Sequence, residues 1–145
     1  MANEMPRADQ YQGLSRKVIE FSHAFNAIVL KAKNGQAADW SEIEALVDVP
    51  NFKRLGAFLG PASEWIDWPT YKKYVADYAS FADWEGTLRR ITETPGLVYL
   101  ELEERNTMKG VTDVSNTVTI YEFNKAGKLR QLDVYVCHIE NRPAS

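Results

Sequence analysis

A chain of 145 residues with a formal net charge of −3 is long enough for one domain with its own apolar core. Apolar residues make up 45% and charged residues 26%, which is a globular composition and excludes a disordered chain. The acidic balance excludes a global positive field, so we expect no nucleic-acid partner and no membrane surface as partner. Cys137 is the only cysteine, which excludes an intrachain disulfide and a cysteine-based zinc site.

No apolar run approaches ~18 residues, the length that a spanning helix needs. The first ten residues also lack the apolar segment of a signal peptide. We therefore expect a cytoplasmic protein. The sequence contains no phosphate-binding loop, no dinucleotide fingerprint, no nucleophile elbow and no His/Asp cluster with metal spacing, so neither a metal nor an organic cofactor is expected.

Three helices are predicted in the first half of the chain. Apolar residues recur at helical spacing over Tyr11–Lys33, and Asn34-Gly35 ends this helix because glycine accepts a positive φ without steric cost. Asp39-Trp40-Ser41-Glu42 has the pattern of a capping box, which predicts a short helix from Trp40 to about Val47. Asp67 is the expected cap of a third helix that runs to about Phe81.

Strands are predicted where the apolar period changes to two. The turns between them contain Pro95-Gly96, Lys109-Gly110 and Ala126-Gly127. The expected strands are Phe52–Leu59, Trp84–Thr92, Leu97–Thr107, Asn116–Phe123 and Lys128–Glu140.

Helices first and antiparallel strands afterwards predict an α+β fold with the helices on one face of the sheet. We expect one domain over residues 11–141, with loose termini over 1–10 and 142–145. Alternation puts Leu102 on the inward face of its strand and Val134 on the inward face of the last strand. His23 is expected on the exposed side of the first helix.

Three segments resemble the nuclear transport factor two-like superfamily, in particular its SnoaL-like branch. They are "FSHAFNA" (Phe21–Ala27), "GLVYLELEERN" (Gly96–Asn106) and "VTIYEFNKAGKLRQLDVYV" (Val118–Val136). The resemblance implies a cone-shaped, curved antiparallel sheet, a half-barrel packed against three helices around one pocket. Members of this superfamily include ketosteroid isomerases, polyketide cyclases, limonene epoxide hydrolases, dehydratases, lyases acting on lignin-derived aromatics, and non-catalytic binding modules.

The resemblance also implies a homodimer that forms through the sheet. The outward residues of the predicted strands would then form much of the interface; they are Tyr99, Glu101, Gln131, Asp133 and Tyr135.

The third helix carries an aromatic face made of Trp68, Tyr71, Tyr74 and Tyr78. One interpretation is a helix that packs these rings on the sheet as core. The other is a pocket wall, because three buried phenol hydroxyls each need a partner. On the second interpretation the four residues bind an aromatic substrate, together with Phe58, Leu102 and Val134.

Glu104 shares the inward face of Leu102. In the resemblance to limonene epoxide hydrolases, Glu104 takes the place of a catalytic aspartate, but the paired arginine position is Leu102. An apolar environment raises the pKa of a carboxyl, which suits a general acid or base. The alternative is that Glu103-Glu104-Arg105 is a solvated run beyond the pocket.

His138 has the parity of Leu132, Val134 and Val136, which predicts an inward histidine that titrates near neutrality. The SnoaL-like cyclases and epoxide hydrolases have an aspartate at the position of Val134, so neither mechanism transfers directly. Arg54 is a candidate cation for a substrate oxygen if it points inward, and an ordinary surface residue if it does not.

These observations predict a cofactor-independent lyase or isomerase that acts on a small aromatic or polycyclic, possibly phenolic, substrate. Its expected catalytic residues are His138, Glu104 and Arg54. Two alternatives stay open at this point. One is a binding or assembly module with the same pocket, and the other is an epoxide-type hydrolase that activates a water molecule.

Overall fold

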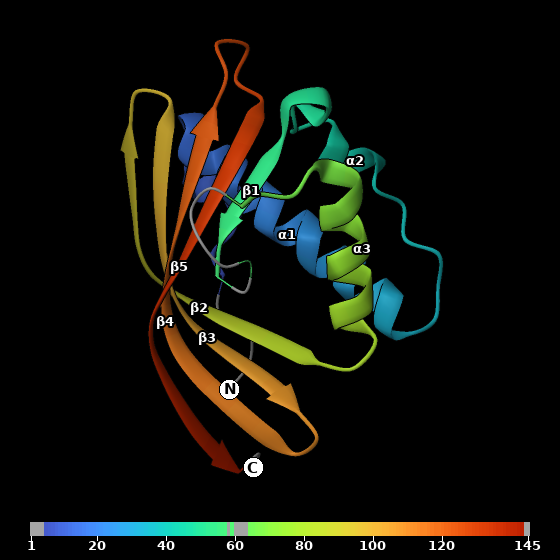
Figure 1. Ribbon diagram of the computed structural model, residues 1–145. Helices are drawn as coiled ribbons and strands as arrows, with labels where there is room; N and C mark the ends of the chain where they lie inside the picture. Colours follow the sequence, from blue (N-terminus) through green and yellow to red (C-terminus); the bar gives the residue numbers. More distant parts are fainter. Residues whose placement is uncertain (1–4, 58, 60–63, 144–145) are drawn as a thin grey trace.

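The computed structural model describes residues 5–57, 59 and 64–143, with side chains up to Cys137. A curved five-stranded sheet curls around the helices α1 and α3 (Figure 1). The α+β prediction is confirmed. The helices are α1 (Gly13–Lys33), α2 (Ser41–Glu44) and α3 (Trp68–Ala79), and the strands are β1 (Lys53–Gly56), β2 (Asp83–Thr94), β3 (Leu97–Met108), β4 (Val111–Phe123) and β5 (Leu129–Pro143).

The two long helices form where the apolar stripes are. The buried stripe of α1 includes Val18, Phe21 and Ile28. At the start of α3 the Asp67 carboxylate accepts a hydrogen bond from the Thr70 backbone N–H at 3.0 Å, which is the predicted cap. None of the helices in the described part of the chain is long and apolar enough to cross a membrane.

Two local expectations differ from the structure. The helix α2 is shorter than predicted because the chain turns after Glu44 and Val47 forms a β-bridge with Leu129 of β5. Within the first ten residues, Ala8–Gln10 forms a 3₁₀ turn and His23 Nε2 lies 2.7 Å from the Pro6 carbonyl oxygen. Residues 5–10 are therefore placed against α1 rather than loose, while His23 is exposed as expected.

The sheet has the strand order β1-β5-β4-β3-β2 and is mixed rather than wholly antiparallel. The four long strands pair antiparallel, but β1 pairs parallel with β5, with Arg54 opposite Leu132. The sequence pattern could not reveal this pairing, because β1 is separated from β5 by α3 and three strands. The parallel edge matters for function since it places Arg54 beside the last strand.

The strand β4 begins at Val111, five residues earlier than the sequence pattern indicated. The cause is the turn before it. Lys109 and Gly110 both have positive φ, 52° and 77°, which is the geometry of a two-residue hairpin turn. Pairing therefore resumes immediately, with Met108 opposite Val111.

The register of β5 shifts between Asn116 and Thr117 of β4. Val136 is opposite Thr117, but the next pair is His138 with Asn116, so one residue of β5 is extra. The alternation that was counted from Leu132 to residue 138 is therefore interrupted. The inward orientation of His138 was inferred from that alternation and stays a prediction.

The core lies between the inner sheet face, α1 and α2. Val98, Leu100 and Leu102 of β3 are at most 5% exposed, as the alternation predicted. Leu132 of β5 is also buried. The inner face therefore supplies one continuous apolar wall from the centre of the sheet.

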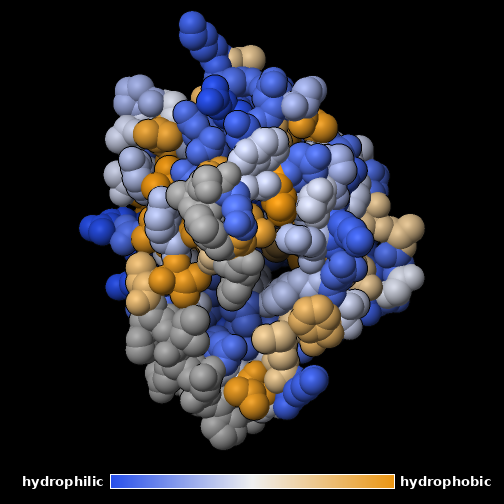
Figure 2. Space-filling view, in the orientation of Figure 1, coloured by the Kyte–Doolittle hydropathy of each residue, from blue (hydrophilic) through white to orange (hydrophobic). Residues whose placement is uncertain are grey.

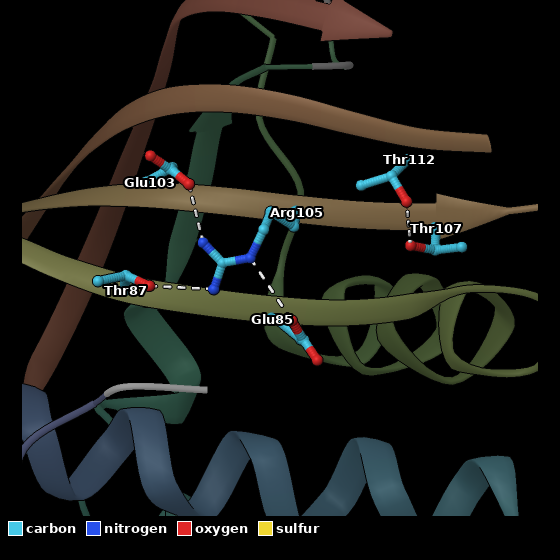
Figure 3. Close-up of polar contacts among 6 residues, drawn as sticks. All are labelled: Glu85, Thr87, Glu103, Arg105, Thr107 and Thr112. Carbon is cyan, nitrogen blue, oxygen red and sulfur yellow. Dashed lines mark hydrogen bonds and ion pairs between the residues drawn. The ribbon is translucent and has the colours of Figure 1, made fainter. Parts of the chain in front are cut away.

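The outer face of the sheet carries a polar cluster around Arg105 (Figure 3). Its guanidinium donates to Glu103 Oε1 at 2.9 Å and to Thr87 Oγ1 at 3.0 Å, and pairs with Glu85 at 3.5 Å. Although it is on the face opposite to Glu104, Arg105 is only 6% exposed. The run Glu103-Glu104-Arg105 is therefore not a solvated segment.

Candidate functional site

A cavity of about 400 Å³ lies between the inner face of the sheet and the helices α1 and α3. Figure 2 shows the surface hollowed beside α3 on the face that Figure 1 presents. Its walls are mostly apolar, from residues such as Phe21, Leu100 and Val136. Of the residues predicted from the sequence, the cavity is lined by Arg54, Tyr71, Tyr74, Tyr78, Leu102, Glu104 and Val134.

Glu104 is the central ionisable group of this cavity. It comes from the middle of β3, and Leu102 beside it on the same face is 5% exposed. Burial raises the pKa of the Glu104 carboxyl. The Trp84 indole opposes this rise, because it donates a hydrogen bond to Glu104 Oε1 at 3.3 Å. The charge of Arg54 stabilises the carboxylate further. The Thr117 hydroxyl is buried and has no hydrogen-bond partner among the described residues.

Arg54 reaches the cavity from β1. Its Nη1 donates to the carbonyl oxygens of Leu55 at 3.2 Å and Ala57 at 2.6 Å. Burial lowers the pKa of the guanidinium, and the nearby Tyr71 and Glu104 oppose that shift. Within the described residues its Nε and Nη2 donors make no hydrogen bond, so they are available to an oxygen atom of a ligand.

The tyrosines of α3 are in two environments. Tyr71 packs its ring on Phe52 and Trp68 and lines the cavity, and burial raises its pKa, so its hydroxyl stays a neutral donor. Tyr78 donates to the Asn106 side-chain oxygen, and burial raises its pKa as well. Tyr74 lines the cavity but remains half-exposed, at 51%.

Trp68 lies outside the cavity, which corrects its interpretation as a wall residue. It is 1% exposed and packs edge-on against Phe52 and Trp40 in the core. Its indole Nε1 donates to Glu44 Oε1 of α2 at 2.8 Å. The helical period could not separate Trp68 from Tyr71, since both lie on one face and only the position of α2 decides which ring is covered.

Two predicted residues lie outside what the structure describes. Phe58 is outside the described residues altogether, and the His138 side chain is outside the described side chains. Their roles remain predictions from the sequence alone.

Several polar residues of this cavity were not indicated by the sequence patterns, among them Trp84, Asn106 and Asp113. Trp84 and Asn106 are opposite one another in the β2–β3 ladder, and Asn106 is opposite Asp113 across β3 and β4. The continued alternation after Gly110 was the signal for Asp113, because residues 111, 113 and 115 extend the inward face of β4. The tight turn hid this signal.

The absence of a side chain at Gly86 leaves the space that the Trp84 ring occupies. Gly86 lies opposite Glu104, and a Cβ atom there would be 2.7 Å from Cη2 and 2.8 Å from Cζ2 of the Trp84 ring. The indole therefore lies over the glycine and extends toward the carboxyl group. A side chain at position 86 would occupy the space of the ring.

The donor set does not resemble a metal centre. Among the described residues, no group of three or more His, Cys, Asp or Glu side chains is arranged to hold a metal ion. The polar groups of the described lining are instead one guanidinium, two carboxyl groups, two side-chain amides, one indole N–H and several hydroxyls. Such a set can bind oxygen atoms and transfer protons.

No family model and no curated protein matches the chain. Solved structures do match it. An NTF2-like protein of unknown function from Burkholderia pseudomallei superposes with a TM-score of 0.67, at 12% identity, over 88% of this chain and 92% of that one. The chain has the NTF2-like fold.

Other NTF2-like neighbours are enzymes. A Δ5-3-ketosteroid isomerase from Mycobacterium sp. has a TM-score of 0.59 at 14% identity, over 85% of this chain and 98% of that one. A limonene-epoxide-hydrolase-like epoxide hydrolase from M. tuberculosis has a TM-score of 0.56 at 13% identity, over 81% and 83%. At these identities the likeness concerns the NTF2-like fold alone, which supports a pocket for small molecules but selects no reaction.

Proposed function

We propose that this protein is a cofactor-independent lyase or isomerase, in which Glu104 transfers a proton to or from a small, largely apolar substrate that carries an oxygen atom. The observation that carries the proposal is a carboxyl group in an apolar cavity, faced by one guanidinium and by neutral hydroxyls. The ketosteroid isomerase among the neighbours supports it at the level of the fold.

The proposed chemistry follows from the raised pKa of Glu104. A carboxylate that binds a proton more tightly is a stronger base. Its raised pKa also lies nearer to the working pH, where general acid–base catalysis is most effective. In the proposed step the ionised Glu104 removes a proton from a carbon next to a carbonyl group of the substrate. The electron pair of that C–H bond forms a C=C bond, the π pair of the carbonyl moves to the oxygen atom as an oxyanion, and Glu104 becomes a neutral acid.

Arg54 and Tyr71 would stabilise the oxyanion that forms. The Arg54 guanidinium, whose Nε and Nη2 make no hydrogen bond to a described residue, supplies a fixed positive charge, and the neutral Tyr71 hydroxyl supplies a hydrogen bond. Isomerisation is completed when Glu104 returns the proton to another carbon. Elimination is completed when the electron pair expels a leaving group, which Glu104 can protonate.

The test is a screen followed by one variant. Phenolic dimers, ketosteroids and small epoxides are incubated with the protein, and thermal stabilisation and product mass are measured. With a converted substrate, Glu104→Gln should lower kcat about 10²–10⁴-fold, the usual contribution of general acid–base catalysis. Glu122→Gln, on the outer face of β4, is the control and should leave kcat unchanged.

Full turnover by Glu104→Gln would refute Glu104 as the base and make His138 the next residue to replace. Stabilisation by a compound class without any conversion would instead support a binding module with the same pocket.

Hydrolysis of a small epoxide is the second candidate, and the position of Arg54 favours it. The sequence alone indicated that Leu102 had replaced the arginine that such a reaction needs. In the structure Arg54 of β1 supplies a guanidinium close enough to affect the pKa of Glu104. Incorporation of ¹⁸O from labelled water into a diol product would distinguish hydrolysis from isomerisation.

We further propose a homodimer that forms through the outer face of the sheet. Tyr135 of β5 is on this face and is 56% exposed, so its ring is accessible to a second copy of the chain. Sedimentation at micromolar concentration should show a dimer, and Tyr135→Arg should shift it toward the monomer. A wild-type monomer would contradict the proposal.

A further inference from the structure

The cavity has two chemically different ends. At one end the walls are apolar, from Phe21, Leu100 and Leu132. The other end lies next to the β3–β4 turn and is called the hairpin end here; it comprises Asn106, Met108, Asp113 and Ser115. A ligand that fills the cavity would therefore need an apolar body and a polar group at the hairpin end.

Asp113 is the charged residue of the hairpin end. It is half-buried on the inner face of β4, opposite Asn106, and within the described part of the chain it makes no hydrogen bond or ion pair. Burial is the main cause of the raised pKa of the Tyr78 hydroxyl, and the charges of Glu104 and Asp113 raise it further. Both carboxyl groups therefore face the same region of the cavity.

Among the described side chains, which end at Cys137, no positive group compensates Asp113 at this end. Arg54 is the cation among the lining residues, and its charge acts on Tyr71 and Glu104. Lys109 is in the exposed turn and does not line the cavity. Because an unpaired carboxylate in a partly desolvated site is unfavourable, a positively charged group of a ligand would be stabilised there.

The neighbouring Tyr78 hydroxyl has the same preference. The Asn106 side-chain oxygen is occupied by the Tyr78 hydroxyl, and since that hydroxyl donates its proton, its own oxygen is left as an acceptor. The Asp113 carboxylate and the Tyr78 oxygen are therefore two acceptors at or beside the hairpin end, next to the donor N–H groups of the Asn106 amide.

We propose that the cavity takes a ligand with an apolar body and a cationic amine, and that Asp113 binds the amine at the hairpin end. This inference rests on the proposal that the cavity is the ligand site, and it names the class of substrate. An anionic ligand of the same size would place its charge against Asp113 and should be rejected.

The test uses naphthalene probes that carry an aminomethyl, a methyl or a carboxylate group at the same ring position. Their Kd values for the purified protein are measured by calorimetry at neutral pH. We expect the aminomethyl probe to bind about tenfold or more tightly than the carboxylate probe, because one carboxylate attracts the first and repels the second. Asp113→Asn should remove most of this preference, while the methyl probe changes less than about twofold.

Asp77→Asn is the matched control. Asp77 is an exposed carboxylate of α3 outside the cavity lining, so this variant removes the same charge without changing the hairpin end. It should keep the preference for the amine. Equal binding of the three probes, an unchanged preference in Asp113→Asn, or no binding of the amine at its solubility limit would each overturn the inference.

The two proposals fail separately. Loss of the amine preference while turnover still depends on Glu104 would remove only the substrate class. An amine preference together with full turnover by Glu104→Gln would refute the proposed reaction and leave the amine site intact.

Discussion

Trp84 Nε1 donates a hydrogen bond to Glu104 Oε1 at 3.3 Å, from the strand that pairs with the strand of the carboxyl group. This contact stabilises the ionised form of Glu104 and is the largest effect that opposes the desolvation of the carboxyl. It depends on Gly86, which leaves room for the indole ring. Trp84 of β2 therefore moderates the rise in the pKa of Glu104 that burial causes.

Replacing Trp84 with phenylalanine should raise the pKa of Glu104 further, since the ring remains but the N–H donor is lost. The titration of the Glu104 carboxyl can be followed by NMR with ¹³C-labelled glutamate, using Glu104→Gln to assign the signal. Trp65→Phe removes an indole that is outside the cavity lining and should leave the titration unchanged. An unchanged Glu104 titration in Trp84→Phe would show that the hydrogen bond does not control this carboxyl.

Gly86→Ala should destabilise the protein by about 1–3 kcal/mol, the usual cost of overpacking, because the new Cβ overlaps the Trp84 ring. Urea denaturation measures the change in the free energy of unfolding. In a Trp84→Leu background the same substitution should cost much less, because the ring is absent. Equal costs in the two backgrounds would mean that the alanine methyl group conflicts with another part of the structure.

The stability of Glu104→Gln relative to wild type should depend on pH. Burial raises the folded-state pKa of Glu104, so the folded protein holds this proton more tightly than the unfolded chain does. As the pH rises from the ordinary glutamate pKa through the raised folded pKa, wild type loses stability at this site and the glutamine variant does not. Melting temperatures measured across this range should show the variant gaining on wild type with rising pH. A constant difference would mean that the pKa of Glu104 is the same in the folded and unfolded states.

The cluster around Arg105 is predicted to stabilise the sheet behind Glu104. Arg105→Met should lower the free energy of unfolding by about 1–3 kcal/mol, since the buried guanidinium makes charged hydrogen bonds to Glu103 and Thr87. Arg90→Met, which removes the exposed ion pair with Glu101, is the control and should have little effect. A small effect at both positions in denaturant titrations would mean that the cluster contributes no net stability.

Local sequence patterns determined most of the elements and several of the cavity residues. Helical periodicity predicted α1 and α3, and alternation on β3 predicted that Leu102 and Glu104 share the inner face. These predictions hold because a helix or strand orients neighbouring side chains through its own backbone geometry.

Only the tertiary structure decided which of these side chains meet. The parallel pairing of β1 with β5 brings Arg54 near Glu104, and α2 covers Trp68 while Tyr71 remains at the cavity. The turn at Lys109-Gly110 adds Asp113 to the cavity, and the bulge before His138 interrupts the parity of β5. Each of these features depends on a distant segment that pairs with or covers the residue, or on a change of register by one residue. The spacing of apolar residues within one segment carries no information about such long-range contacts or about register.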